Sequence, residues 1–176
     1  MTLISEEYLA QLREYREGTR PLWGNGGKPH VKRVTDLIEK EKIKTVLDYG
    51  CGHGLLLRRI VSNHTLAPKL AQFYDPGIEK YATLPKPAQL VISTDVLEHI
   101  EHECLDDVLD HIHSLTERLA YLAPHTGPAK AILPDGRNAH LIQESSDWWQ
   151  DRLCTLFSEV HVMTASALRP VFLCAP

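Results

Sequence analysis

The sequence predicts an α/β protein built on a mostly parallel, doubly wound sheet with helices on both faces. Three short apolar runs each lead directly into an aspartate, at Thr45–Leu47, Ala71–Tyr74 and Leu90–Thr94. Such runs are typical of buried strands, and segments with helical spacing of apolar residues separate them. Strands that alternate with helices predict a parallel sheet, because each connection must cross one face of it. Two further apolar runs, 160–163 and 170–174, have only a short turn between them and predict a C-terminal antiparallel hairpin.

The N-terminal part of the chain predicts helices rather than strands. Apolar residues at 8, 9, 12 and 15 form a helical stripe within Glu6–Glu17, and a second stripe follows Pro29. The glycine-rich stretch 23–29 between them predicts a loop. A chain of 176 residues is long enough for one domain and too short for two ordinary ones. We therefore expect a single domain over 1–176, with a helical cap at 1–44 and a core at 45–176.

The other elements follow from the same periodicities. They are predicted as helices at Leu55–Val61, 105–119 and 147–157 and a strand at 120–123. His111 and His113 belong to the second of these helices, and we expect both to be solvated. Trp148 and Trp149 are neighbours on the last helix and cannot share a face of it. One of them is expected in the core and the other partly exposed.

Composition and charge restrict the class of protein. With 43% hydrophobic and 24% charged residues, the chain has the composition of a soluble globular domain. The first residues lack the features of a signal peptide, and no apolar run approaches the roughly 20 residues that span a bilayer, so a cytoplasmic protein is expected. A net charge of −4 argues against a grip on duplex phosphates, while a nucleotide or a small RNA stays open. The four cysteines form no C-x-x-C pair, which predicts reduced thiols.

Three glycines alternate with other residues directly after the first strand, at Gly50, Gly52 and Gly54. A glycine turn at this edge of a parallel sheet lets a ligand approach bare backbone amides. Asp48 at the strand end would repel a diphosphate but suits an ammonium group, and Asp75 at the next strand end suits ribose hydroxyls. S-adenosylmethionine carries both groups and fits this pattern. A purely structural turn and a nicotinamide site are the alternatives.

Three motifs in order resemble those of the class I S-adenosylmethionine-dependent methyltransferases: VLDYGCGHG, FYDP and LVISTDVLEHI. The resemblance implies a Rossmann-like fold and this cofactor. It places the methionine part at Asp48 and the 50–54 turn, where Cys51 is a small packing residue. It places the ribose at Asp75, with Pro76 beside the adenine, and Asp95 facing the transferred methyl group. The family fits a helix and a strand where this chain has only residues 76–89, so we expect six strands, or seven with one very short.

Polar residues gather in two segments on the expected acceptor side. One is the run from Asp95 to His99, followed by Glu101, His102, Glu103 and Cys104, and the other is the loop 133–144. A loop this rich in functional groups is more often a site than a spacer. We expect His99, His140 and Asp95 to be catalytic, with one histidine as general base or acceptor-orienting group. The expected acceptor-binding residues are Glu98, Asp135, Arg137, Asn138 and His140. Arg137 has two interpretations: it binds a carboxylate or phosphate of the acceptor, or it forms a salt bridge with Asp135 or Glu144.

A metal site is a further interpretation of the same segments. Asp95, Glu98 and His99 resemble the E-x-x-E-H metal motif of small-RNA 3′-terminal 2′-O-methyltransferases, with an aspartate in the first position. In that resemblance His140 completes a ligand set for Mg²⁺ or Mn²⁺. Because L-E-H at this point is also common in metal-free small-molecule methyltransferases, a divalent metal is possible but not favoured.

The function expected from these observations is methyl transfer from S-adenosylmethionine to a small polar acceptor, at oxygen or nitrogen. The chain has no N/D-P-P-Y/F motif and no Pro-Cys nucleophile after the third strand, which disfavours methylation of nucleobase amino groups and of cytosine C5. A metal-assisted ribose 2′-O-methyltransferase acting on RNA ends or nucleotides is one alternative. A catalytically silent protein that keeps the fold for binding a partner is the other. No membrane partner is expected, and the oligomeric state stays open.

Overall fold

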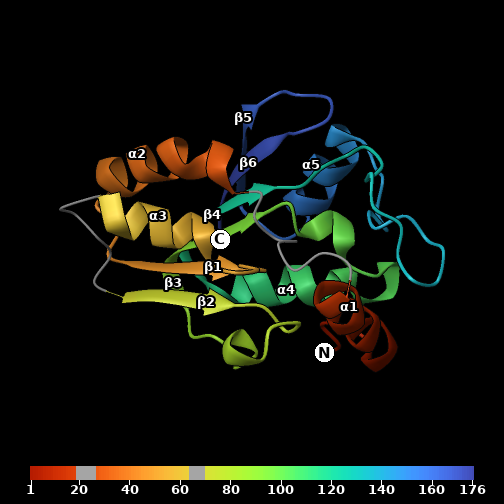
Figure 1. Ribbon diagram of the computed structural model, residues 1–176. Coiled ribbons are helices and arrows are strands. Elements are labelled where there is room, and N and C mark those ends of the chain that lie inside the picture. Colours follow the sequence, from red (N-terminus) through yellow and green to blue (C-terminus); the bar gives the residue numbers. More distant parts are fainter. Residues whose placement is uncertain (19–26, 64–69) are drawn as a thin grey trace.

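A computed structural model describes residues 1–18, 27–63 and 70–176. The first four positions of the loop predicted at 23–29 therefore lie outside the described residues. One six-stranded sheet has the order β2-β1-β3-β4-β6-β5 (Figure 1). Its strands are β1 Thr45–Tyr49, β2 Leu70–Tyr74, β3 Ala88–Thr94, β4 Thr116–Ala123, β5 Glu159–Thr164 and β6 Val171–Ala175. The predicted α/β class is confirmed, and the strand number is the lower of the two expected.

Strand direction brings the predicted polar residues to one edge. β2, β1, β3 and β4 are parallel, and Asp48 of β1 pairs in register with Phe73 of β2 and Ile92 of β3. β6 runs antiparallel to both β4 and β5, which confirms the predicted closing hairpin. Because β6 is reversed, its first residues lie beside the last residues of β4, as the pairing of Leu122 with Phe172 shows. The ends of β1 to β4 and the start of β6 therefore share one edge.

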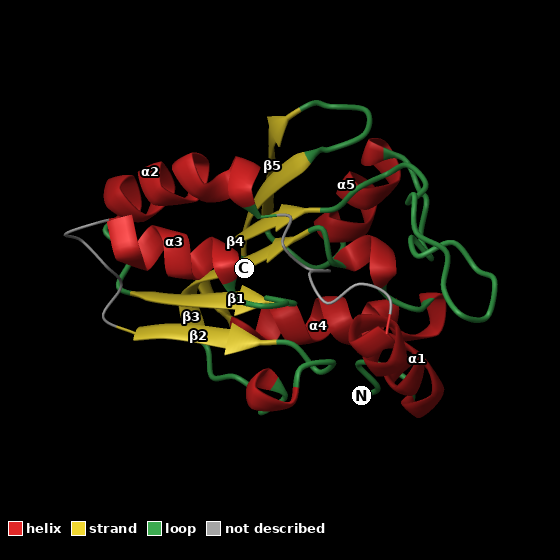
Figure 2. Ribbon diagram, in the orientation of Figure 1, coloured by secondary structure: helices red, strands yellow, loops and turns green. Residues whose placement is uncertain are grey.

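Helices cover both faces of the sheet (Figure 2). Their bounds are α1 Glu6–Gly18, α2 Val31–Glu41, α3 Leu55–Asn63, α4 Leu105–Leu115 and α5 Ser146–Cys154. Alternate residues of β1 enter different cores, as expected for a strand that is buried on both faces. Val46 packs with residues of α2 and α3, whereas Leu47 packs with residues of α4 and α5. α1 does not join either layer, since its buried residues pack against the loop at 131–139.

The segment between β2 and β3 is reduced, as the sequence predicted. It contains one short 3-10 helix, η2 Glu79–Tyr81, in place of the helix and strand of the family. The Tyr81 ring stacks on Phe73 with 5.4 Å between the ring centroids, and the Tyr81 hydroxyl accepts a hydrogen bond from Arg58 at 2.8 Å. The turn at 79–81 is thus fastened to β2 and α3 by an aromatic residue.

Two sequence predictions for the region after β3 were wrong. The helix predicted at 105–119 ends at Leu115, because Thr116 leaves helical geometry and its hydroxyl donates to the Ile112 carbonyl, so that β4 starts there. His111 is not solvated: it is 8% exposed, and its Nδ1 lies 3.0 Å from the Tyr49 hydroxyl. The tryptophan prediction is confirmed, since Trp149 is fully buried and Trp148 is partly exposed. No described helix combines the length and the apolarity that a bilayer span requires.

Candidate functional site

The turn after β1 has a backbone conformation that favours glycine at three positions. Gly50, Gly52 and Gly54 all have positive φ, at 73°, 54° and 73°. This region of backbone conformation costs little for glycine and is strained for other residues. A Cβ on Gly50 would also lie 2.4 Å from a methyl group of Val96. The loop therefore passes close to the end of β3 and exposes backbone in place of side chains.

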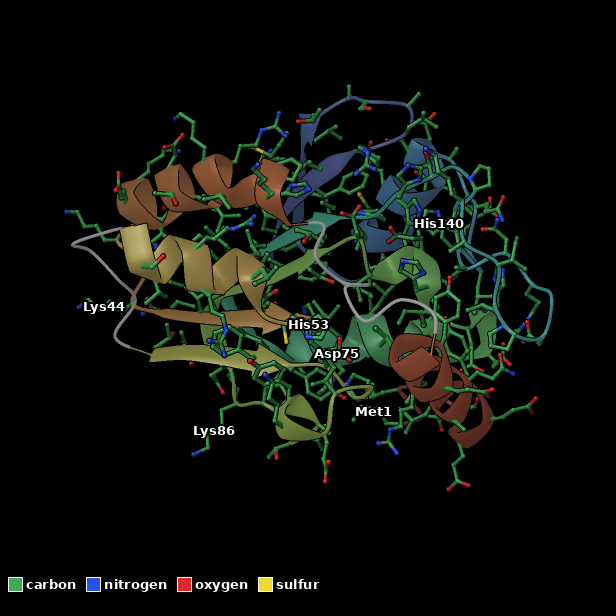
Figure 3. The ribbon with its side chains drawn as sticks, viewed as in Figure 1. Met1, Lys44, His53, Asp75, Lys86 and His140 are labelled. Atoms are coloured by element: carbon green, nitrogen blue, oxygen red, sulfur yellow. The ribbon has the colours of Figure 1, made fainter. Side chains whose placement is uncertain are left out.

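Asp75 is fixed beside this turn by backbone donors. Its side chain is nearly buried, and one carboxylate oxygen accepts from the Gly52 N–H at 3.0 Å. The other accepts from the Gly77 N–H at 2.9 Å. Figure 3 shows Asp75 close to His53 of the same turn, at the edge where the parallel strands end. The predicted ribose-binding carboxylate thus lies directly against the glycine turn.

Asp48 is the second carboxylate of this edge, and it is the more buried. It is 3% exposed, and its Oδ2 has no hydrogen-bond partner among the described residues. Burial raises its pKa to about 7, and the charge of Asp75 adds to the shift, while the Leu57 N–H opposes it. A buried carboxylate oxygen without a partner costs free energy unless a proton or a cation joins it. The Asp48 carboxylate therefore suits a cationic group of a ligand.

Cys51 and Pro76 flank these two carboxylates. Cys51 is buried, and its thiol donates to the Gly52 carbonyl at 3.4 Å, so it packs inside the turn. Pro76 directly follows Asp75 and is half-buried. Both residues thus accompany the glycine turn, next to the carboxylates that the sequence assigned to the cofactor.

The second group of predicted residues is a histidine cluster. The ring centroids of His99 and His140 are 4.8 Å apart, and those of His140 and His125 are 4.9 Å apart. Nδ1 of His99 lies 2.6 Å from the Ala139 carbonyl, and Nδ1 of His140 lies 2.5 Å from the Gly127 carbonyl. Because a carbonyl only accepts, each Nδ1 carries a hydrogen, and in a neutral ring the lone pair is then on Nε2. Burial lowers the pKa of His140, which favours its neutral form.

Glu98 lies at the base of this cluster and is fully buried. Within the described ranges 1–18, 27–63 and 70–176, neither of its carboxylate oxygens has a hydrogen-bond partner. Burial raises its pKa to about 8, with a smaller contribution from Asp95. One ligand atom each from Glu98, His99 and His140 lie within 4.8 Å of one another. The structure thus brings together three of the four residues that resembled a metal motif.

Asp95, the fourth, is outside that group. It has a φ of 52°, and its Oδ1 lies 3.3 Å from Nη1 of Arg169. A positive φ is uncommon in residues other than glycine, and such residues cluster at turns and functional sites. Arg169 belongs to the turn before β6, and the sequence analysis did not single it out. The 74 positions that separate it from Asp95 left no local signal.

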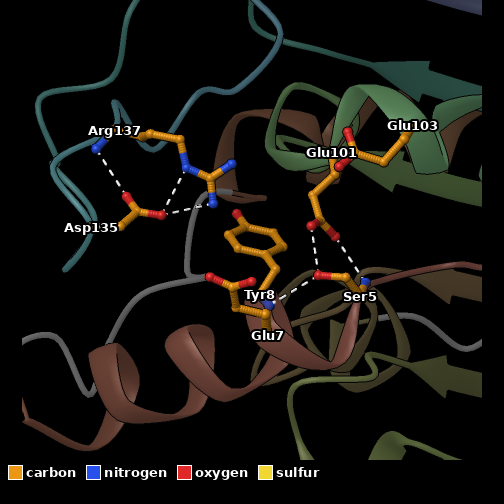
Figure 4. A pocket seen from close by; sticks show the side chains of 7 residues that line it. All are labelled: Ser5, Glu7, Tyr8, Glu101, Glu103, Asp135 and Arg137. Carbon is orange, nitrogen blue, oxygen red and sulfur yellow. Dashed lines mark hydrogen bonds and ion pairs between the residues drawn. The ribbon is translucent and has the colours of Figure 1, made fainter.

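Asp135 and Arg137 lie on another side of the same loop, against α1. Arg137 Nη2 and Asp135 Oδ2 are 2.7 Å apart, so the second interpretation of Arg137, a pair with Asp135, is the one observed. The Arg137 guanidinium also lies over the Tyr8 ring, 5.8 Å from its centroid. The two residues line a cleft of about 410 Å³ together with Ser5, Glu7, Tyr8, Glu101 and Glu103. Figure 4 shows these seven side chains.

Asn138 holds the loop in shape. Its Oδ1 accepts from the N–H groups of Ala129 and His140, and its Nδ2 donates to the Ala129 carbonyl. Of the loop residues predicted to bind the acceptor, His140 alone joins the histidine cluster. Sequence reasoning also missed His125, which is part of that cluster. Glu101, from the first polar segment, anchors α1 instead, because it accepts from the N–H and hydroxyl of Ser5 at 2.8 and 2.7 Å.

Comparison with known proteins decides the family. A family profile described as "Methyltransferase domain" matches residues 28–172, which is most of the chain. The chain belongs to this methyltransferase family. The resemblance seen in the glycine turn and the strand-end aspartates is thereby confirmed. No curated protein sequence matches this chain closely.

Solved structures confirm the fold of the family. An O-methyltransferase family protein from Burkholderia thailandensis has a TM-score of 0.67 and 15% identity, over 99% of this chain. The present chain spans only 63% of that protein. The magnesium protoporphyrin IX methyltransferase from Synechocystis PCC 6803, solved with bound S-adenosylhomocysteine, has a TM-score of 0.64 and 16% identity, covering 95% of this chain and 98% of that one. The small RNA methyltransferase HEN1 has a TM-score of 0.62 and 14% identity, covering 84% of this chain and 25% of that one.

Proposed function

We propose that this methyltransferase-family protein transfers a methyl group from S-adenosylmethionine to an oxygen or nitrogen of a small polar acceptor. The observation that supports this best is the strand edge where Asp48 and Asp75 flank the positive-φ glycine turn. Two buried carboxylates repel a diphosphate and attract a ligand with hydroxyl donors and a cationic group. The family match and the fold of the solved structures agree with this cofactor.

The residues of this edge fit the parts of the cofactor. Asp75 would hold the ribose hydroxyls, since its carboxylate is already aimed by the Gly52 and Gly77 amides. The unpartnered oxygen of Asp48 would receive the ammonium of the methionine part. When bound, S-adenosylmethionine supplies a methyl group that is already activated by its sulfonium. What remains for the protein is to align the acceptor and to remove its proton.

The histidine cluster supplies a group for that proton. Neutral His140 presents its Nε2 lone pair, because its Nδ1 hydrogen is held by the Gly127 carbonyl. His99 is oriented in the same way by the Ala139 carbonyl. We assign the general base to this pair, next to which Glu98 is buried with a ligand atom within 4.8 Å of theirs. A neutral imidazole placed beside the acceptor can take the proton of a hydroxyl or an ammonium group.

Calorimetric titration with S-adenosylhomocysteine tests the cofactor site. We expect micromolar binding by the wild type and at least tenfold weaker binding by Asp75→Ala, which removes the ribose acceptor. Asp36→Ala is the matched control, because Asp36 lies exposed on α2 and pairs with Lys32 of the same helix. Absence of binding by the wild type would contradict the proposal and favour the silent binding protein. Equal affinity of wild type and Asp75→Ala would contradict the assignment of Asp75.

A metal-assisted reaction is the second candidate, and one observation favours it. The ligand atoms of Glu98, His99 and His140 lie within 4.8 Å of one another, and the Glu98 carboxylate lacks a partner in the described structure. Backbone carbonyls orient both histidines through Nδ1, as second-shell groups do at metal sites. Such a site would hold Mg²⁺ or Mn²⁺ near the acceptor oxygen, as the alternative of a ribose 2′-O-methyltransferase requires.

Metal titration separates the two candidates without a known acceptor. For the metal-assisted reaction, Mn²⁺ should bind the wild type with a dissociation constant in the micromolar range, measured by electron paramagnetic resonance. Glu98→Gln should weaken this binding at least tenfold, and Glu103→Gln, an exposed residue nearby, should not. Undetectable Mn²⁺ binding would leave the metal-free reaction as the function. Once an acceptor is found, full activity in EDTA would lead to the same conclusion.

A further inference from the structure

Arg169 occupies the acceptor side of the site by virtue of the sheet topology. β6 is antiparallel, so the residues just before it reach the edge where β3 and β4 end. There Arg169 Nη1 lies 3.3 Å from Asp95 Oδ1. Burial raises the pKa of Glu98 and lowers that of His140, and the charge of Arg169 makes a smaller contribution that opposes the first shift and adds to the second. One guanidinium thus faces the residues that we assign to the reaction.

The turn that carries Arg169 is held against the histidine-bearing loop. The Thr126 N–H donates to the Leu168 carbonyl at 3.1 Å, and the Thr126 hydroxyl donates to the Ala167 carbonyl. The Arg169 N–H donates to the Ser166 hydroxyl at 3.1 Å. Thr126 immediately follows His125 of the cluster. The turn and the loop therefore form one positioned unit rather than two independent surface segments.

The Arg169 guanidinium has donors to spare. Its side chain is 59% exposed, and its ion pair with Asp95 uses one end of a group that has five N–H donors. The other arginine of this region, Arg137, is occupied by a side-chain hydrogen bond from Nε and an ion pair from Nη2, both to Asp135. Arg169 is thus the better placed of the two for a planar, bidentate contact with a ligand.

The surroundings of Arg169 leave its guanidinium accessible to an anion. Asp95, its ion-pair partner, is the more buried of the two, with 25% of its side chain exposed. The rings of His125 and His140, with 4.9 Å between their centroids, lie on the loop that Thr126 holds against the turn of Arg169. We infer that Arg169 binds a carboxylate or phosphate group on the methyl acceptor, beside these two histidines. The inference rests on the proposed methyl transfer and narrows its substrate to anionic molecules.

Histidine-ring NMR spectra can test this with simple anions. The protein is titrated with inorganic phosphate and with acetate, free and saturated with S-adenosylhomocysteine, in EDTA and against chloride at matched ionic strength. We expect saturable shifts of the His125 and His140 signals with at least one of the two anions. Arg169→Gln should weaken the apparent affinity at least tenfold, and Arg169→Lys should retain part of it. Arg152→Gln, which breaks an exposed ion pair to Asp106 elsewhere, should leave it unchanged.

The outcomes distinguish this inference from the proposed function. If S-adenosylhomocysteine binds but the ring signals follow ionic strength alone, Arg169 is not an anion site and the methyltransferase proposal stands. Equal responses of the wild type and Arg169→Gln would also overturn the inference. If S-adenosylhomocysteine fails to bind while the Arg169-dependent shifts appear, the anion site is confirmed and the proposed methyl transfer is contradicted. Phosphate and acetate responses, compared with each other, show which anionic group the site prefers.

Discussion

Replacing Asp48 by asparagine should stabilise the protein against unfolding at pH 8 while it abolishes cofactor binding. In the folded state the pKa of Asp48 is raised to about 7, from an ordinary value of 3.8. The unfolded chain therefore loses this proton near pH 3.8, whereas the folded protein keeps it until about pH 7. Since the unfolded state is the one that releases the proton first, stability declines as the pH rises through this interval.

The size of the effect follows from the two pKa values. At roughly 1.4 kcal/mol per pKa unit, the raised pKa costs about 1.7 kcal/mol at pH 5 and about 4 kcal/mol at pH 8. Asparagine removes this cost, but its amide N–H₂ replaces the unpartnered Oδ2 and costs about 1–3 kcal/mol if it stays unbonded. Asp48→Asn should thus be about 1–3 kcal/mol more stable than the wild type at pH 8, and close to it in stability at pH 5.

Urea denaturation of both proteins at pH 5 and pH 8 measures this. The stability difference between Asp48→Asn and the wild type should change by roughly 2–3 kcal/mol between the two pH values. Effects of other titrating groups cancel, because both proteins contain them. Asp36→Asn is the control for the same substitution at an exposed position on α2. A difference for Asp48→Asn that is the same at both pH values would refute the reasoning, as would unchanged affinity for S-adenosylhomocysteine.

Three further predictions concern the supports of the site. In urea titrations, Gly50→Ala should lower the free energy of unfolding by about 2–4 kcal/mol, because φ is positive and the added Cβ would clash with Val96. Gly136→Ala should lower it by about 1 kcal/mol, because φ is also positive there but no atom lies within 4 Å of the added Cβ. Burial lowers the pKa of His111 below 6.5, so wild-type stability should fall as the pH drops below 6.5, and this acid loss should be smaller in His111→Asn. Trp149→Ala should lose about 3–5 kcal/mol, because the side chain is fully buried, whereas a loss under about 1 kcal/mol in thermal or urea unfolding would contradict that packing.

The strand edge was predictable because its signals are local. Each strand has a short apolar run, and an aspartate ends or follows it, so Asp48, Asp75 and Asp95 mark their own positions. The parallel arrangement then brings these ends together without any further information. The reduced connection between β2 and β3 was also readable, since residues 76–89 are too few for a helix and a strand. Features that depend on local apolar runs, and on the number of residues between them, could therefore be predicted from the sequence.

The errors arose where one residue fits two patterns or where a partner is distant. Leu119 extends the apolar stripe of α4 but also fits an alternating strand, and the hydrogen bond from the Thr116 hydroxyl to the Ile112 carbonyl coincides with the boundary. His111 lies at the margin of the same helical stripe, so periodicity alone predicts that its side chain is exposed to solvent. Its burial depends on the Tyr49 hydroxyl, which β1 supplies from 62 positions earlier. Such contacts are created by the fold and leave no trace in the local sequence.

The two aspartate–arginine pairs of the acceptor side show the same distinction. Asp135 and Arg137 are two positions apart, and their pair closes a turn of one loop, so the fold is not needed to bring them together. Asp95 and Arg169 meet only because β6 is reversed and starts at the edge where β3 ends. Asp95 has a positive φ, and the guanidinium of Arg169 is largely exposed. Unlike the Asp135–Arg137 pair, these two residues do not close a turn within one loop. The pair made by the fold is therefore the better candidate for contact with an acceptor, although the sequence drew attention to the other.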